Sequence, residues 1–207
     1  MSTALRAFLL VLVAILTLAV NVVAQPTIVN FDFGAVPIVC AGTGCAYQGP
    51  VFRCQFPYPM QDFNSDPRFG WTLSFAKGVV TGNAGLTGPN SAFDPPSFNG
   101  LPFTQAVLLQ NTGGSILQAV PGFTAGTYTL SFYLGSRAFW GDQVVEALID
   151  GMVIGTWALT SGTPFTLVTA PFTVTTDGTH TVEFRGAKFP PDQTAFLSYV
   201  VITPTER

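Results

Sequence analysis

The chain has 207 residues, of which only 9% are charged and 48% are hydrophobic, and its formal net charge is −3. The eight basic residues form no cluster, which excludes both a nucleic-acid interface and a polybasic membrane-surface patch. The length suits one domain with a sizeable hydrophobic core, and the nineteen phenylalanines favour β-strands.

Residues 1–24 have the pattern of a secretory signal peptide. Arg6 gives a positively charged start, residues 7–19 are almost uninterruptedly apolar, and Val22-Val23-Ala24 ends the segment as a signal peptidase requires. An uncleaved anchor is the alternative, because the apolar run approaches the roughly 17 residues that can span a bilayer. The cleavage pattern favours removal. We therefore expect a secreted, extracellular protein whose mature part, residues 25–207, has no membrane span.

Three cysteines, Cys40, Cys45 and Cys54, fall in an insertion at about residues 35–69 that is also rich in Gly, Pro and aromatic residues. In an oxidising compartment any of three pairings could form one disulfide, which leaves a third cysteine either free or bonded to another chain. Structural zinc needs four ligands, and the one histidine, His180, lies far away in the sequence. We expect a disulfide rather than a metal site.

The first half of the mature chain predicts short strands separated by long loops. Apolar or aromatic runs predict strands at Pro26–Phe33, Gly70–Phe75, Ala106–Gln110 and Ser115–Val120. Between the second and third of these, the glycines and prolines of Gly78–Phe103 predict a loop.

The second half shows the clearest strand pattern. In Thr127–Leu134, aromatic and aliphatic residues alternate with mostly polar ones, which is typical of a strand with one buried face. Gln143–Ile149 and Met152–Leu159 flank Asp150-Gly151, a strong hairpin signal. Three further strands are expected, at Phe165–Thr175, Thr179–Arg185 and Thr194–Ile202.

About ten short strands with Gly-rich turns, and no convincing helical period after the signal peptide, predict an all-β fold. The alternatives are an antiparallel β-sandwich, a jelly roll or a barrel. We find no internal repeat and no linker that would divide residues 25–207 into two domains.

Several motifs, in this order, resemble the galactose-binding-domain-like jelly rolls of secreted proteins and carbohydrate-binding modules. The resemblance covers nearly the whole mature chain except the cysteine-rich insertion, and it implies an antiparallel β-sandwich of the jelly-roll type. The segments that carry it are Asn30–Gly34, Gly70-Trp71, Leu109-Gln110, Gly114–Val120, Ala125–Phe132, Leu148–Gly151, Gly178–Phe184 and Thr194–Ile202.

The resemblance also implies a place for a structural calcium ion, next to acidic residues in the first motif and the last strand. In this chain those two positions are Gly34 and Ser198, and Asp32 could supply only one carboxylate nearby. Calcium prefers several carboxylate and carbonyl oxygens. We therefore expect this site to be weak or empty, and we expect no cofactor.

Carbohydrate recognition needs an exposed flat aromatic ring beside fixed polar groups, usually on loops or on a sheet face. The segment from Arg137 to Asp142 offers aromatics, a cation and an acid within one turn, although a structural Arg–Asp pair with Trp140 over the core edge would explain it equally well. The loop before the last strand is a second candidate. Together they give the predicted ligand-binding residues Arg137, Phe139, Trp140, Asp142, Arg185, Asp192 and Gln193.

Other side chains have mainly structural explanations. Trp71 and Trp157 lie in strand patterns and are expected in the core, and His180 alternates with apolar residues as a packed, hydrogen-bonded histidine would. Glu146 and Glu183 could be imagined as the paired carboxylates of a glycosidase, but they lie in no recognisable constellation. A third loop, Ser91–Phe103, could present Phe93, Phe98 and Asn99 to a ligand.

The leading functional hypothesis is a secreted, non-catalytic module that binds carbohydrate of a cell wall, matrix or surface coat. The alternative is an extracellular structural protein whose aromatic loops bind another protein. A carbohydrate-processing enzyme is the least favoured hypothesis, because no catalytic motif is present in the sequence. The sequence leaves the oligomeric state open.

Overall fold

The computed structural model describes residues 25–35, 38–41, 44–47, 53–55, 67–74, 83–91, 93–188 and 193–205. The predicted signal peptide lies outside these ranges, and so does Asp192. Every regular element within the described ranges is a strand, and none of the described residues form a helix long and apolar enough to cross a membrane.

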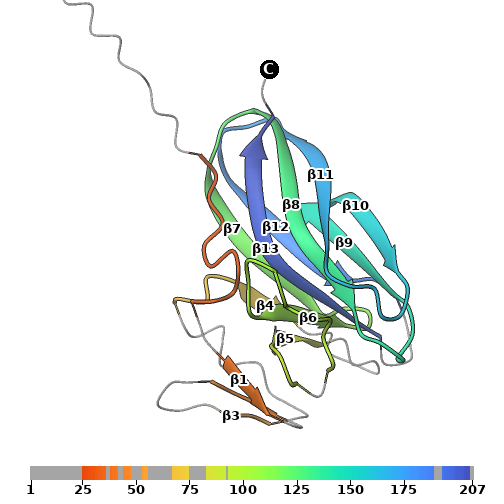
Figure 1. Ribbon diagram of the computed structural model, residues 1–207. Helices are drawn as coiled ribbons and strands as arrows, with labels where there is room; N and C mark the ends of the chain where they lie inside the picture. Colours follow the sequence, from red (N-terminus) through yellow and green to blue (C-terminus); the bar gives the residue numbers. More distant parts are fainter. Residues whose placement is uncertain are drawn as a thin grey trace, which may run out of the picture.

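Two five-stranded antiparallel sheets lie face to face (Figure 1). The sheet that we call the β9 sheet has the spatial order β10 (Met152–Leu159), β9 (Gln143–Ile149), β12 (Gly178–Gly186), β7 (Ser115–Phe123) and β4 (Thr72–Ser74). The sheet that we call the β8 sheet has the order β11 (Thr166–Val174), β8 (Gly126–Ser136), β13 (Thr194–Pro204), β6 (Ala106–Gln110) and β5 (Asn83–Thr87). This arrangement confirms the predicted antiparallel sandwich.

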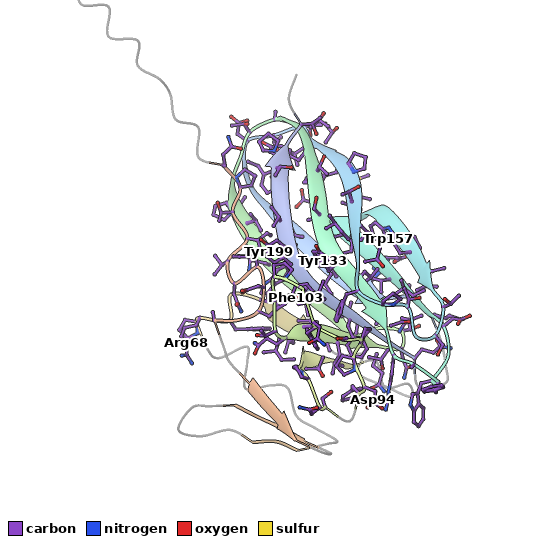
Figure 2. The ribbon with its side chains drawn as sticks, in the orientation of Figure 1. Arg68, Asp94, Phe103, Tyr133, Trp157 and Tyr199 are labelled. Carbon is purple, nitrogen blue, oxygen red and sulfur yellow. The ribbon has the colours of Figure 1, made fainter. Side chains whose placement is uncertain are left out.

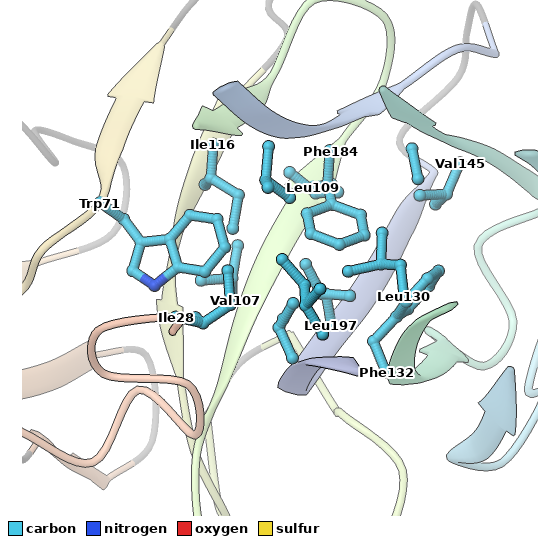
Figure 3. Packing of buried hydrophobic residues seen from close by; sticks show 14 of the residues in the cluster. Ile28, Trp71, Val107, Leu109, Ile116, Leu130, Phe132, Val145, Phe184 and Leu197 are labelled. Carbon is cyan, nitrogen blue, oxygen red and sulfur yellow. The ribbon is translucent and has the colours of Figure 1, made fainter. Parts of the chain in front are cut away.

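The core lies between the inner faces of the two sheets (Figure 3). Along β8, Tyr128, Leu130, Phe132 and Leu134 are buried, while the residues between them are only partly buried. The same alternation appears along β12, where Val182 and Phe184 are fully buried. Period-two alternation therefore decides which face of each strand enters the core.

Aromatic rings connect the two sheets at the centre of this core. The rings of Phe132 in the β8 sheet and Phe184 in the β9 sheet meet edge to face, with centroids 4.8 Å apart. Trp157 packs against Phe132 at 5.0 Å, and Trp71 against Phe184 at 6.3 Å. Both tryptophans therefore contribute to the core, as the strand patterns predict.

The Asp150-Gly151 hairpin also has the predicted form. Both residues have positive φ, 50° for Asp150 and 78° for Gly151, as a type I′ turn requires. The turn places Met152 opposite Ile149 and so sets the register of β9 and β10.

The predicted strand at Pro26–Phe33 is wrong, because residues 29–35 form consecutive turns and a bend. Asn30 and Phe33 have left-handed φ values of 52° and 59°. The Asn30 side chain accepts a hydrogen bond from the Ala35 amide at 2.8 Å and donates one to the Phe69 carbonyl at 3.0 Å. These side-chain bonds to the backbone replace the ladder that a strand would need.

A buried amide holds this N-terminal segment on the sandwich. Gln118 on β7 accepts a hydrogen bond from the Val29 amide at 2.8 Å and donates one to the Val29 carbonyl at 2.9 Å. The same side chain donates to the Gly70 carbonyl at 2.8 Å. Gln118 therefore satisfies backbone hydrogen-bonding groups of Val29 and Gly70, two residues that lie outside the β-ladders.

Two segments predicted as irregular contain strands. β5 lies inside the predicted loop Gly78–Phe103 and pairs with β6. Inside the cysteine-rich insertion, β1 (Ile38–Ala41), β2 (Gly44–Tyr47) and β3 (Arg53–Gln55) form a small antiparallel sheet. Its register places Cys45 opposite both Cys40 and Cys54.

Removing the central inter-sheet ring contact should be costly. Phe184→Ala is expected to lower the free energy of unfolding by about 3–5 kcal/mol, because it leaves a cavity between Phe132 and Trp71. Urea unfolding followed by tryptophan fluorescence measures the change. Glu183→Gln, on the outer face of the same strand, should change stability by less than about 0.5 kcal/mol; similar losses in both variants would contradict the assigned core.

Candidate functional site

The turn that follows β8 carries most of the predicted site. Its first residue, Arg137, is fixed through its backbone: the amide donates to the Thr194 carbonyl at 3.0 Å, and the carbonyl accepts from the Gly162 amide at 3.1 Å. Gly141 has a φ of 102°, and a Cβ there would lie 3.3 Å from Cγ of Gln193. The turn therefore packs closely on the start of β13.

Aromatic rings flank the guanidinium group of Arg137. Its Cζ atom lies 4.3 Å from the centroid of the Trp140 ring and 5.3 Å from that of Phe93, both within the range of a cation–π interaction. The arginine itself is buried, with 8% of its surface exposed. Arg137 is therefore a support for the aromatic side chain above it.

The same turn exposes large aromatic surface. Phe139 is 97% exposed and Trp140 is 47% exposed, and Phe139 has a left-handed φ of 68°. We call Arg137, Phe139 and Trp140 the aromatic turn. The Trp140 ring of this turn packs on Arg137, whereas the Phe139 ring is almost fully exposed.

Polar groups lie beside the aromatic turn. One carboxylate oxygen of Asp142 accepts a hydrogen bond from the Ser161 amide at 3.0 Å, and the other lies 3.9 Å from Nζ of Lys188. Both side chains are substantially exposed, so this ion pair contributes little to stability. Asp142 and Lys188 therefore remain accessible to hydroxyl groups of a ligand.

Gln193 joins the site from the start of β13. Its amide donates to the side-chain oxygen of Asn111 at 2.9 Å, and its carbonyl accepts from the Asn111 amide at 2.8 Å and from Nε2 of Gln143 at 3.0 Å. Its own side-chain oxygen is buried, as is Oγ1 of Thr194, and neither has a hydrogen-bond partner among the described residues. The structure thus brings Gln193, from the second candidate loop, to the aromatic turn.

Of the two remaining predicted residues, the structure describes Arg185. Arg185 lies directly opposite Glu146 on the neighbouring strand, and its Nε atom donates to the Glu146 carboxylate at 2.7 Å. Asp192 lies outside the described residues. The structure thus groups Arg137, Phe139, Trp140, Asp142 and Gln193, and it engages Arg185 in an ion pair.

In the third candidate loop, Ser91–Phe103, the aromatic side chains pack against the protein and do not project freely into solvent. Phe93, Phe98 and Phe165 are partly buried against Ala106, Leu108 and Phe196 on the outer face of the β8 sheet. Only Asn99 of the three residues suggested there is exposed. Phe93 lies against the guanidinium of Arg137. No local pattern in the sequence predicts this contact, because 44 positions separate the two residues.

A row of aromatic residues on the outer face of the β8 sheet was not predicted as a surface feature (Figure 2). The ring of Tyr133 lies 5.3 Å from Phe103 and 6.2 Å from Tyr199, and Tyr199 contacts Phe31 edge to face at 5.0 Å. Phe103 is buried and Phe31 is 39% exposed. The outward positions of β8 alternate with the core positions, and this alternation was the available signal for Tyr133.

His180 is a packed, hydrogen-bonded histidine, as the sequence predicts. Its Nδ1 atom lies 2.5 Å from the Asp150 carboxylate and its Nε2 atom 2.9 Å from the Thr176 carbonyl. The hydrogen bond to Asp150 raises the pKa of His180 above its usual 6.5, against the opposing effect of burial. Since both acceptors are oxygens, the doubly protonated imidazolium suits this environment best.

The same pair shifts the titration of Asp150. Burial acts to raise the pKa of Asp150, but hydrogen bonds from His180 and the Thr181 amide outweigh it and hold the pKa below 3.8. The pair closes the Asp150-Gly151 hairpin against β12. It therefore has a structural role, away from the aromatic turn.

Solved structures similar to this chain include several carbohydrate-binding modules. The CBM22-1 xylan-binding domain from Paenibacillus barcinonensis Xyn10C is 10% identical, with a TM-score of 0.47, and the match covers 67% of this chain and 87% of that domain. The module CBM36 in complex with calcium and xylotriose is 17% identical, with a TM-score of 0.43, over 64% of this chain and 98% of that one. A family 35 module from Clostridium thermocellum is 14% identical, with a TM-score of 0.43, over 65% and 98%.

No protein-family model matches the chain, and no curated protein matches it in sequence. The assignment of the jelly-roll type therefore rests on the strand order and register described above.

The His180–Asp150 pair gives a pH-dependent prediction. The contribution of His180 is complete below pH 6.5 and is lost as the pH rises through its raised folded-state pKa, whereas that of Asp150 is lost as the pH falls below 3.8. Asp150→Asn should therefore destabilise the protein most near about pH 5, by only about 1 kcal/mol, because the Asp150 side chain is 49% exposed and solvent weakens its attraction to His180. Urea unfolding of both proteins at about pH 5 and about pH 9 measures this; an equal loss at both pH values would contradict the ion pair.

Proposed function

We propose that this protein is a secreted, non-catalytic module that binds carbohydrate through the aromatic turn. The observation that carries the proposal is that Trp140 lies on the buried guanidinium of Arg137 while nearly half of its surface remains exposed. A ring held from behind in this way is preorganised. It can stack on the C–H face of a pyranose without the entropic cost of first being ordered.

The neighbouring groups suit a sugar. Phe139 offers a second apolar surface at 97% exposure, and Asp142 and Lys188 offer exposed acceptors and donors for hydroxyl groups. Binding sites for small ligands commonly combine apolar rings with a few placed polar groups. Since the ligand carries no charge, stacking and hydrogen bonds to its hydroxyl groups would dominate, and we expect weak affinity with little dependence on salt.

A binding role without catalysis agrees with the placement of the carboxylates. Glu146 and Glu183 lie on the outer face of neighbouring strands, but the Glu146 carboxylate accepts a hydrogen bond from Arg185 at 2.7 Å. A glycosidase needs one carboxylic acid and one free carboxylate across a cleft. An ion-paired glutamate on a sheet face is a poor candidate for either role.

Secretion and an extracellular location belong to the same proposal and rest on the signal-peptide pattern of residues 1–24. A cell wall, matrix or surface coat would then supply the ligand. An extracellular protein partner is the alternative that the exposed Phe139 and Trp140 also fit, and the binding experiment below separates the two.

Loss of the stacking ring should abolish most of the binding. Mature protein is first screened against an array of neutral polysaccharides, and the best binder is then titrated by calorimetry. Trp140→Ala is expected to bind at least about tenfold more weakly. Met152→Ala, 75% exposed in the β9–β10 hairpin, is the matched control and should bind normally.

Two results would contradict the proposal. One is the absence of a response to every polysaccharide by the unmodified protein, and the other is unchanged affinity in Trp140→Ala. Thermal unfolding of each variant confirms that it is folded, since Trp140 also contacts Arg137.

The register of the small sheet formed by β1, β2 and β3 limits which pairs of cysteines are close enough for a disulfide. The backbone register places Cys40 and Cys54 on either side of Cys45, so two strand spacings, about 9.5 Å, separate the backbone of Cys40 from that of Cys54. A disulfide requires Cα atoms closer than about 7 Å. We therefore propose that Cys45 is one partner of the disulfide, with Cys40 or Cys54 as the other.

This pairing predicts different thiol counts in two variants. After alkylation without reduction, mass spectrometry of the secreted protein should show one modified cysteine in the unmodified chain and two in Cys45→Ser. Cys40→Ser should show none, because Cys54 can still bond to Cys45. A cross-linked peptide containing Cys40 and Cys54 would exclude the proposal, and a thiol-dependent dimer would favour the protein-binding alternative.

A further inference from the structure

The family resemblance implies a calcium ion near Gly34 and Ser198. The structure describes both residues, so their surroundings can be compared with the ligands that calcium needs. Ser198 is fully buried in β13, opposite Tyr133 of β8, and Gly34 lies within the turns of the N-terminal segment. Among the described residues, no group of three or more His, Cys, Asp or Glu side chains could hold a metal ion. Of the groups that the structure describes, carbonyl oxygens would therefore have to supply most of the ligands.

Protein donors already occupy those carbonyl oxygens. The hydroxyl group of Ser198 donates to the Gln105 carbonyl at 3.0 Å and lies 3.4 Å from the Asp32 carbonyl. The side-chain amide of Gln105 donates to the Phe33 carbonyl. Gln105, Ser198 and Phe33 are all buried, so these bonds are shielded from water.

A calcium ion does not fit this arrangement. The ion takes six to eight oxygen ligands with several carboxylates among them. Among the residues that the structure describes, the carboxylate of Asp32 lies nearby, and it accepts a hydrogen bond from the Gly34 amide at 2.9 Å. The amide hydrogens of Gln105 and the hydroxyl hydrogen of Ser198 point positive ends at the same carbonyl oxygens, which opposes a cation.

We propose that Gln105 and Ser198 replace a structural cation as the connection between the N-terminal segment and the β8 sheet. Their hydrogen bonds join residues 32 and 33 to β13 and to the residue before β6, where they act together with the bond from the Val200 amide to the Phe31 carbonyl at 2.8 Å. A neutral network of this kind needs no ion, so the stability of the fold is independent of calcium.

The first test compares thermal unfolding of the mature protein in calcium chloride with unfolding in EDTA, and it adds terbium luminescence as a direct probe of a lanthanide-accessible calcium site. The midpoints should agree within the error of the measurement. No saturable terbium signal that calcium displaces should appear, although Trp71 and Tyr199 are close enough to this region to sensitise one. A lower midpoint in EDTA, or a saturable and displaceable signal, overturns the proposal.

Variants test the network itself. Ser198→Ala and Gln105→Ala should each lower the unfolding midpoint by about 3 °C or more, equally with and without calcium, because each leaves a buried carbonyl without its donor. Thr203→Ala, at an exposed position of the same strand, is the matched control. Unchanged midpoints in both network variants would overturn the proposed role.

The reverse exchange should create a calcium dependence. A Cβ at position 34 would lie 3.1 Å from Oδ1 of Asp32, so Gly34→Glu adds a carboxylate beside an existing one. The variant that combines Gly34→Glu with Ser198→Asp should show a midpoint that rises with added calcium and falls in EDTA. A folded double variant without any response to calcium would show that these positions do not mark the place of a cation, and it would overturn the replacement.

Discussion

Aromatic rings that meet between the two sheets hold the sandwich together. Phe132 and Phe184 meet at 4.8 Å, one from each sheet, and Trp157 and Trp71 extend the contact on either side. Each of these rings removes a large apolar surface from water, and close packing fixes their relative positions. Because the inner faces are filled in this way, recognition is left to the turns and to the outer faces.

Buried amides then position the segments that have no ladder. Gln118 holds residues 29 and 70, Asn111 and Gln143 hold Gln193, the residue before β13, and Gln105 reaches the Phe33 carbonyl. An amide side chain both donates and accepts, so one residue can satisfy the two kinds of backbone group that a loop exposes. The chain uses neutral hydrogen bonds of this kind at sites where charged residues or ions could have served.

The sequence predicts the second half of the chain well and the first half poorly, for a physical reason. β8 and the β9–β10 hairpin combine strict alternation with a turn that specifies positive φ, so local information is sufficient. β5, with the sequence Asn-Ala-Gly-Leu-Thr, has no such pattern, and it is a strand because β6 pairs with it. Residues 26–33 look extended, but Asn30 bonds to the backbone of Phe69, a contact that no local pattern reveals.

The same division applies to the candidate site. Arg137, Phe139, Trp140 and Asp142 are neighbours in the sequence, so their grouping is predictable, whereas the contacts of Phe93 with Arg137 and of Gln193 with Gly141 depend on the tertiary fold. From the sequence, a binding role and a structural role fit Arg137 equally well. In the structure, two backbone hydrogen bonds hold Arg137, and its buried guanidinium lies against the Trp140 ring.

The conformation and exposure of Phe139 indicate that the aromatic turn has a purpose other than stabilising the fold. A bulky residue with a φ of 68° is an uncommon and strained conformation, which costs about 1 kcal/mol or more. At 97% exposure the ring regains almost none of this cost by burial, and a glycine or asparagine would adopt the turn more favourably. Folding alone therefore gives no reason for an aromatic residue at this position. A ligand that covers the rings of Phe139 and Trp140 together would supply the missing apolar contact, and it would do so at the part of the molecule where Arg137 and the Gly141–Gln193 contact already hold the backbone in place.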